Sequence, residues 1–172
     1  MHPMDPDKLA RYVSVALPPR PVADCARLRD TTTQGIAWEG VERLMNHKAW
    51  IEARPSFLLS GPRGCGKTTA LCRVGIHEIA CRRNVEYVAV TRFASVLKAG
   101  THDRMNMHRL ESADLLLIDE LHRFGGLPAW VQSEIVGLID LRYSQLQQMG
   151  AAGTLPIEPL ADMMGREVVE RF

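Results

Sequence analysis

Short apolar runs alternate along the chain with longer segments whose apolar residues recur at helical spacing. The runs Ser56–Ser60, Val85–Val90 and Leu115–Ile118 are short enough to be buried parallel strands. A weaker run over Met149–Gly153 predicts a fourth strand. Strands that alternate with helices favour an α/β fold, in which a parallel sheet is covered by helices and ligands bind at the carboxyl ends of the strands.

The segments between these runs predict the helices. Apolar positions recur at helical spacing over Thr68–Cys81, and a short helix is expected over Arg92–Ala99. A basic connector is expected between that helix and the third strand. Pro128 then opens a long amphipathic segment that continues to Leu146. Each of the first three strands is therefore followed by a predicted helix.

The first 30 residues differ from the rest. A short helix is expected over Asp7–Ala16, closed by the prolines of residues 18–21, which would stiffen an extended connector. Helix-spaced apolar positions follow over residues 31–51. The 172 residues, of which 46% are hydrophobic, suffice for one sizeable core. We therefore expect an arm or linker over residues 1–30 and one globular domain over residues 31–172.

Composition excludes several classes of protein. The formal net charge of +1 argues against a chain built wholly around polyanion binding, so any nucleic-acid contact needs a local basic patch. The four cysteines have neither zinc-site nor disulfide spacing. No apolar run approaches the roughly 18 residues of a membrane span, and the first residues do not resemble a secretory signal. We expect a cytoplasmic protein with reduced thiols and no membrane contact.

The segment after the first predicted strand carries the clearest chemistry. It follows the pattern G-x-x-x-x-G-K-[ST], in which glycines let backbone N–H groups turn toward phosphate oxygens. We expect Lys67 to reach the β- and γ-phosphates of ATP, and Thr68 to bind Mg²⁺ through its hydroxyl group. The residues expected to bind the nucleotide are Gly61, Pro62, Arg63, Gly64, Cys65, Gly66, Lys67, Thr68 and Thr69.

The third predicted strand ends in two acidic residues, about fifty positions after the loop. Asp119 at the strand tip can hold Mg²⁺, and Glu120 can polarise the water that attacks the γ-phosphate. A solvated strand end is the ordinary alternative for such a pair. The phosphate-binding loop favours the catalytic interpretation, and the combination predicts ATP hydrolysis. His122 is expected to be a loop residue.

Four segments together resemble the AAA+ ATPases of the DnaC and IstB type, which are helicase loaders and transposition helpers. They are the loop, Leu115–Leu121, Leu141–Tyr143 and Gly165–Phe172. The resemblance spans about residues 30–172. It implies a P-loop NTPase that uses ATP and Mg²⁺ and assembles on DNA or on a partner, either a replicative helicase or a transposase.

The resemblance also implies an architecture. The strand order would be 1-4-3-2, and the chain stops at Phe172, where the family continues into a fifth strand beside the first. The helical lid of the family has no counterpart either. We expect a truncated product or a sheet of only four strands, whose first strand is covered at its edge by the N-terminal arm or by a partner.

Two further site residues follow from the resemblance. Thr154 falls where the family places a polar sensor, although asparagine is more frequent there, and a surface turn is the alternative. Arg171 matches an arginine that reaches into the site of a neighbouring subunit, which is worth about 10³–10⁵ in rate and requires a homo-oligomer. A helix-terminal arginine paired with Glu167 is the alternative, and Arg166 is a second candidate.

Residues 92–109 form the densest basic stretch of the chain. In the resembled family this region faces single-stranded DNA, and here it could follow the backbone of single- or double-stranded DNA. An ordinary solvated face is the alternative. The charged residues and histidines of the stretch are Arg92, Lys98, His102, Asp103, Arg104, His108 and Arg109.

Two rival functions stay open beside an ATPase of DNA metabolism. A binding module could use ATP only to choose between conformations, without turnover, although Glu120 argues against it. A small-molecule kinase would need an acceptor pocket and an arginine-bearing lid, and neither is visible after Thr68. Within the ATPase interpretation, the sequence does not distinguish a protein that loads a helicase from one that assists a transposase.

Overall fold

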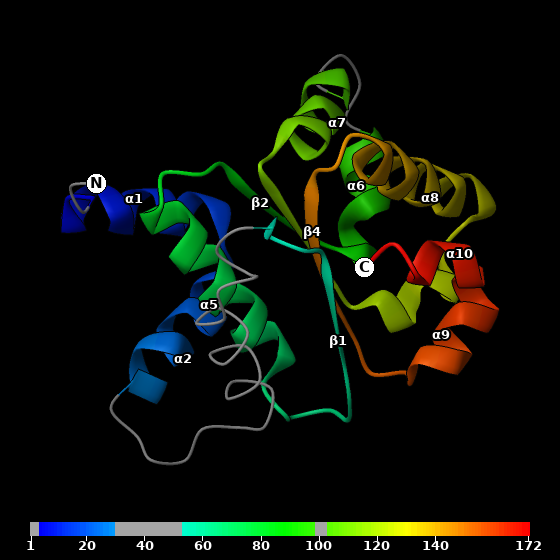
Figure 1. The fold of residues 1–172 in the computed structure, drawn as a ribbon, viewed down its shortest axis with the longest axis horizontal. Coiled ribbons are helices and arrows are strands. Elements are labelled where there is room, and N and C mark those ends of the chain that lie inside the picture. Colours follow the sequence, from blue (N-terminus) through cyan, green and yellow to red (C-terminus); the bar gives the residue numbers. More distant parts are fainter. Residues whose placement is uncertain (1–3, 30–52, 99–102) are drawn as a thin grey trace.

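The computed structural model describes residues 4–29, 53–98 and 103–172. A parallel sheet runs through the middle of the molecule, with helices on both sides (Figure 1). The order of its strands is β1-β4-β3-β2, which confirms the predicted order. The strands are β1 (Phe57–Ser60), β2 (Val85–Ala89), β3 (Leu115–Asp119) and β4 (Gln148–Gly153).

The helices divide into two groups, one on each face of the sheet (Figure 1). On the first face lie α1 (Pro6–Ala16), α2 (Pro19–Arg29) and α5 (Lys67–Ala80). On the second lie α6 (Phe93–Lys98), α7 (Asp103–Ser112), α8 (Ala129–Ser144), α9 (Ile157–Met164) and α10 (Arg166–Val169). Among the described residues, no helix has the length and apolar character needed to cross a membrane.

Strand β3 shows how the sequence sets the two cores. All five of its residues are buried, because the strand has neighbours on both edges and helices on both faces. Leu116 and Ile118 enter the core shared with α8 and α9, whereas Leu115 and Leu117 pack on the side of α5. The same alternation directs Asp119 toward the α5 side, where the phosphate-binding loop lies.

The N-terminal residues form two helices. Asp5 caps α1 by accepting hydrogen bonds from the N–H groups of Asp7 and Lys8, both at 3.1 Å. The predicted extended connector is wrong, because Pro19 begins α2, and the first turn of a helix tolerates proline. Both helices pack on α5. The boundary predicted at residue 30 lies outside the described residues and stays a prediction.

Helix α7 occupies the place where the sequence predicts only a basic connector. Its residues are mostly polar, and only a narrow apolar side, with Leu110 buried and Met107 partly buried, packs against the core. A helix with so few apolar positions gives a weak periodic pattern, which explains why the sequence does not reveal it.

Arg142 anchors several elements from inside the core. Its side chain is fully buried, and its guanidinium donates to the backbone carbonyls of Leu110, Glu111, Ala113 and Gln148 at 2.7–3.0 Å. Burial lowers the pKa of Arg142 to about 10, so the group remains charged at neutral pH. Arg142 therefore joins α8 to the end of α7 and to the start of β4.

Candidate nucleotide site

The loop between β1 and α5 needs glycine because of its backbone conformation. Gly64 and Gly66 have φ angles of 80° and 86°, in the left-handed region that side chains with a Cβ rarely adopt. A Cβ at either position would meet no atom within 4 Å, so conformation rather than space requires glycine here. Gly66 is also the N-cap of α5, whose first N–H groups therefore face the loop.

Lys67 folds back across this loop. Its ammonium donates to the carbonyls of Gly61 and Pro62 at 2.8 and 2.7 Å, and its Nζ lies 3.5 Å from Sγ of Cys65. Only 9% of Lys67 is exposed. The cation is thus held within the loop at the first turn of α5, where a phosphate group would gain both the charge and the helix N-terminus.

The two residues expected to hold Mg²⁺ touch each other. The hydroxyl of Thr68 donates to Oδ2 of Asp119 at 2.7 Å, which links the start of α5 to the tip of β3. Oδ1 of Asp119 accepts from the N–H of Glu120, also at 2.7 Å. Mg²⁺ takes few protein oxygens and completes its shell with water and phosphate, so one hydroxyl and one carboxylate fit this ion.

Tyr87 is a third partner of Asp119 that the sequence analysis missed. Its hydroxyl donates to the same Oδ2 atom at 2.9 Å. Tyr87 lies on β2, two residues before Ala89, which pairs with Asp119, so both side chains lie on the α5 face. Burial and the Asp119 carboxylate raise the pKa of Tyr87 far above its ordinary value, so the hydroxyl stays protonated and keeps donating.

Glu120 stands in an unusual backbone conformation. Its φ and ψ angles are 61° and 33°, in the left-handed region, which costs a residue other than glycine about 1–3 kcal/mol. Its Oε2 atom accepts a hydrogen bond from the hydroxyl of Thr91 at 2.7 Å. Thr91 lies in the short helix η1 (Val90–Arg92), directly after β2. A residue of the neighbouring strand end thus holds the expected general base, and the sequence analysis missed this residue too.

The turn after Glu120 forms another wall of the site. This 3₁₀-helix, η3 (Leu121–Gly126), buries Leu121 and Phe124 in the core, while His122 and Arg123 line the site. Nδ1 of His122 is buried without a hydrogen-bond partner among the described residues. Burial and the charge of Arg123 lower the pKa of His122, so the ring is neutral at neutral pH. His122 belongs to a loop turn, as expected, but it faces the site, and Arg123 was missed.

These groups enclose a hollow of about 430 Å³ at the carboxyl ends of the strands. Thr154 lines it, as does Gly153 at the end of β4, and the Ser60 hydroxyl ties the end of β1 to the Leu155 carbonyl at 2.7 Å. Gly61, Pro62 and Cys65 do not line the hollow. The other lining residues are Arg63, Gly64, Gly66, Lys67, Thr68, Thr69, Asp119, Glu120, His122 and Arg123.

Arg171 does not line this hollow. It forms an ion pair with Asp140 of α8, rather than with Glu167, and its guanidinium lies 5.5 Å from the centre of the Tyr143 ring. Arg171 is therefore engaged within its own subunit. A role in the site of a neighbouring subunit stays a prediction.

The basic stretch of residues 92–109 is partly neutralised. Arg109 makes a two-pronged ion pair with Glu86 of β2, with atoms 2.8–3.2 Å apart. Arg92 is exposed. The side chains of Lys98, Asp103 and Arg104, and the whole of residue 102, lie outside the part that the structure describes. DNA contact by this stretch stays a prediction.

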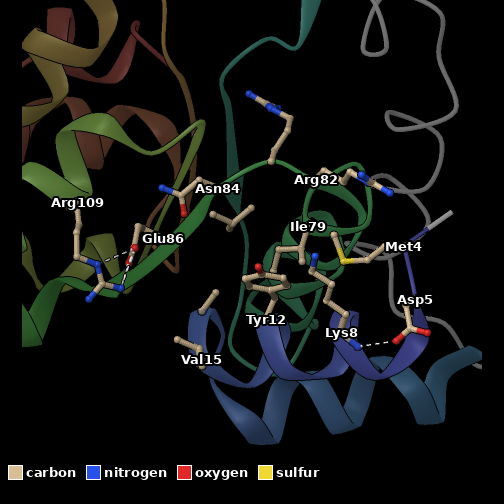
Figure 2. Close-up of a pocket in the computed structure, with 13 residues that line it drawn as sticks. Met4, Asp5, Lys8, Tyr12, Val15, Ile79, Arg82, Asn84, Glu86 and Arg109 are labelled. Atoms are coloured by element: carbon tan, nitrogen blue, oxygen red, sulfur yellow. Dashed lines mark hydrogen bonds and ion pairs between the residues drawn. The ribbon is translucent and has the colours of Figure 1, made fainter. Parts of the chain in front are cut away.

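A second, larger hollow lies at the opposite end of the sheet (Figure 2). It encloses about 620 Å³ between α1 and the turn that leads into β2. Tyr12 and Val15 form part of its wall, with Lys8 and Arg82 beside them. None of the residues expected to bind ATP lines it.

A comparison with protein families matches residues 53–151, more than half of the chain, to the AAA domain. No curated protein matches the chain.

Solved structures share the fold. DnaI is 18% identical over 94% of this chain and 91% of its own, with a TM-score of 0.68, and the DnaC helicase loader is 17% identical over 82% and 88%, with a TM-score of 0.63. AMPPCP-bound DnaA from Aquifex aeolicus is 25% identical over 83% of this chain and 44% of its own, with a TM-score of 0.64. The chain thus spans less than half of the DnaA structure. Its fold is that of the DnaC and DnaI P-loop NTPases, and the chain belongs to the AAA domain family.

Proposed function

We propose that this protein is an ATPase of DNA metabolism that binds ATP with Mg²⁺ at the loop of residues 61–68 and hydrolyses it. The hydrogen bond between Thr68 and Asp119 is the observation that carries the proposal. It joins the phosphate-binding loop to the acidic strand tip, and Glu120 follows at once. A solvated strand end, the alternative for this acidic pair, would not converge on the loop in this way.

The described residues suit this reaction. Lys67 and the N-terminus of α5 would bind the phosphates, and Thr68 with Asp119 would hold Mg²⁺, which neutralises charge on the β- and γ-phosphates when bound. Glu120 would accept a proton from water as the water oxygen attacks the γ-phosphorus and the bond to the ADP oxygen breaks. The hydrogen bond from Thr91 to Oε2 would restrain the side chain of Glu120, while Oε1 would stay available to accept the proton.

The partner is proposed from the structural neighbours. One is described as a helicase loader, and another is a replication initiator bound to AMPPCP and single-stranded DNA. We favour a replicative helicase as partner, with ATP binding promoting assembly on it or on single-stranded DNA. A homo-oligomer with Arg171 acting in trans, Thr154 as sensor and residues 92–109 on DNA belong to the same proposal. A transposase remains the alternative partner.

Phosphate release by the purified protein tests the proposal. Phosphate release should require Mg²⁺ and disappear in Lys67→Ala. The rate per subunit should rise with single-stranded DNA or with protein concentration. Mixing Lys67→Ala with Arg171→Ala should restore part of the turnover if Arg171 acts in trans. Failure of the wild-type protein to bind AMPPCP with Mg²⁺ would overturn the proposal.

One observation favours a nucleotide-controlled binding module instead. Thr91 holds Glu120 by a hydrogen bond, which is the state expected of a protein that binds ATP and rarely hydrolyses it. AMPPCP binding without phosphate release, with and without DNA, would support the module. Thr91→Val separates the two cases, because freeing Glu120 should raise turnover several-fold in an ATPase that is merely restrained.

A further inference from the structure

We propose that Arg123 contacts the γ-phosphate of ATP from within the same subunit, and so distinguishes ATP from ADP. This inference rests on the proposed ATP site and adds a residue that neither the loop nor the strand-tip acids supply.

The backbone directs Arg123 into the site. The left-handed conformation of Glu120 turns the chain at the end of β3, and the N–H of Arg123 donates to the Glu120 carbonyl at 2.8 Å. Leu121 and Phe124 are 0% and 3% exposed, and they fix one side of the 3₁₀ turn in the core. With three residues per turn, His122 and Arg123 must then face away from that core, toward the hollow that they line.

Arg123 and Arg63, which belongs to the loop, are the two cations of the site without a side-chain partner among the described residues. The ammonium of Lys67 donates to two loop carbonyls. Asp119 accepts hydrogen bonds from Thr68 and Tyr87, and Glu120 accepts one from Thr91. Among the described residues, Arg123 makes no side-chain hydrogen bond or ion pair, although its side chain lines the hollow. A planar guanidinium with unused donors suits a phosphate group, which it binds through two parallel hydrogen bonds.

The position of Arg123 indicates which phosphate it would meet. The loop amides and Lys67 lie at the start of α5, where the β-phosphate would sit, whereas Glu120 lies where water would attack the γ-phosphate. Arg123 is on the turn that follows Glu120, so it lies on the Glu120 side of the hollow, where the γ-phosphate would sit. Arg171, by contrast, is tied to Asp140 and Tyr143 outside the hollow.

Calorimetric titration of the full chain with AMPPCP and with ADP, both with Mg²⁺, tests the inference. Arg123→Ala should weaken AMPPCP binding about 10- to 100-fold, as expected for the loss of charge-assisted hydrogen bonds, and leave ADP binding unchanged. Arg123→Lys should recover part of the loss, because lysine restores the positive charge but not the two parallel hydrogen bonds of a guanidinium. Arg11→Ala, on the exposed side of α1, is the matched control and should change neither affinity.

Mixing experiments decide whether Arg123 acts within its own subunit. Arg123→Ala subunits mixed with Lys67→Ala subunits should show no recovery of phosphate release, because neither subunit then has a complete site. Recovery would overturn the action in cis. Equal loss of AMPPCP and ADP affinity, or no loss of either, would overturn the contact with the γ-phosphate.

These outcomes are distinguishable from failure of the proposed function. If the wild-type protein binds neither nucleotide, the ATP site is wrong and this inference with it. If the wild-type protein binds AMPPCP and Arg123→Ala binds it equally well, only the inference about Arg123 is wrong.

Discussion

The two hollows of this protein lie at opposite ends of the same sheet, and their charged residues are used differently. In the larger one, Arg109 is locked in a two-pronged ion pair with Glu86, and Lys8 lies over the Tyr12 ring at 5.9 Å (Figure 2). The smaller hollow is lined by cations and acids that form no such ion pair with one another among the described residues. Its cations include Arg123, and its acids meet hydroxyl groups rather than cations.

The difference suggests a distinction between charged residues that stabilise the fold through ion pairs and charged residues that are available to bind a ligand. The smaller hollow also contains a left-handed Glu120 and a buried Nδ1 of His122 that has no partner among the described residues. Both features cost stability, and such features persist mainly where function requires them. Volume alone would have selected the larger hollow, which also has a left-handed residue, Arg82, but no buried side-chain atom without a partner among its described lining residues. Equivalent substitutions in the two hollows should therefore have unequal effects.

The largest contrast is expected from replacing an acid by its amide. Glu120→Gln removes the proposed general base and should lower the rate of phosphate release about 10²- to 10⁴-fold, while AMPPCP binding persists. Glu86→Gln makes the same chemical change in the larger hollow and should leave turnover unchanged in the absence of DNA. Steady-state phosphate release, with calorimetry for binding, measures both. Equal rates in the two variants would contradict the assignment of Glu120.

Local patterns account for what the sequence predicted well. The loop and the strand β3 are each made of consecutive residues, so glycine spacing was enough to find the loop and an apolar run was enough to find the strand. The sheet order followed from the family resemblance. Asp119 and Glu120 were predicted as site residues because they end that run, and both line the hollow beside the loop.

Residues whose role depends on contacts across the fold were not predicted. Tyr87 and Thr91 meet the acids only because β2 and β3 are paired in register. Arg142 stood in a family motif, but its four carbonyl partners come from α7, β4 and the connection before β3. Arg123 faces the site because Leu121 and Phe124 are anchored, and a sequence does not show which side of a short turn is buried.

The next contrast compares two tyrosines. Tyr87→Phe removes one of the donors to Asp119, and loss of a residue that orients a metal ligand typically costs about 10- to 100-fold in metal affinity or activity. Tyr12→Phe, in the larger hollow, is the matched control. A titration of phosphate release with Mg²⁺ should show a higher half-maximal concentration for Tyr87→Phe only. Superimposable Mg²⁺ curves for Tyr87→Phe and the wild-type protein would mean that Tyr87 only fills space.

The smallest effect should come from breaking the ion pair of the larger hollow. Arg109 is 56% exposed and Glu86 14%, so water and salt screen the pair, and Glu86→Gln should lower the free energy of unfolding by no more than about 1 kcal/mol. Denaturant unfolding measures this loss.

The same variant tests whether the basic stretch meets DNA. Freeing Arg109 should add about one phosphate contact, so the slope of the logarithm of single-stranded DNA affinity against the logarithm of salt concentration should steepen by about 0.7. Arg109→Ala is the control and should not steepen the slope. If Glu86→Gln leaves the slope as it is in the wild-type protein, Arg109 does not reach DNA, and the charge of the larger hollow serves the fold alone.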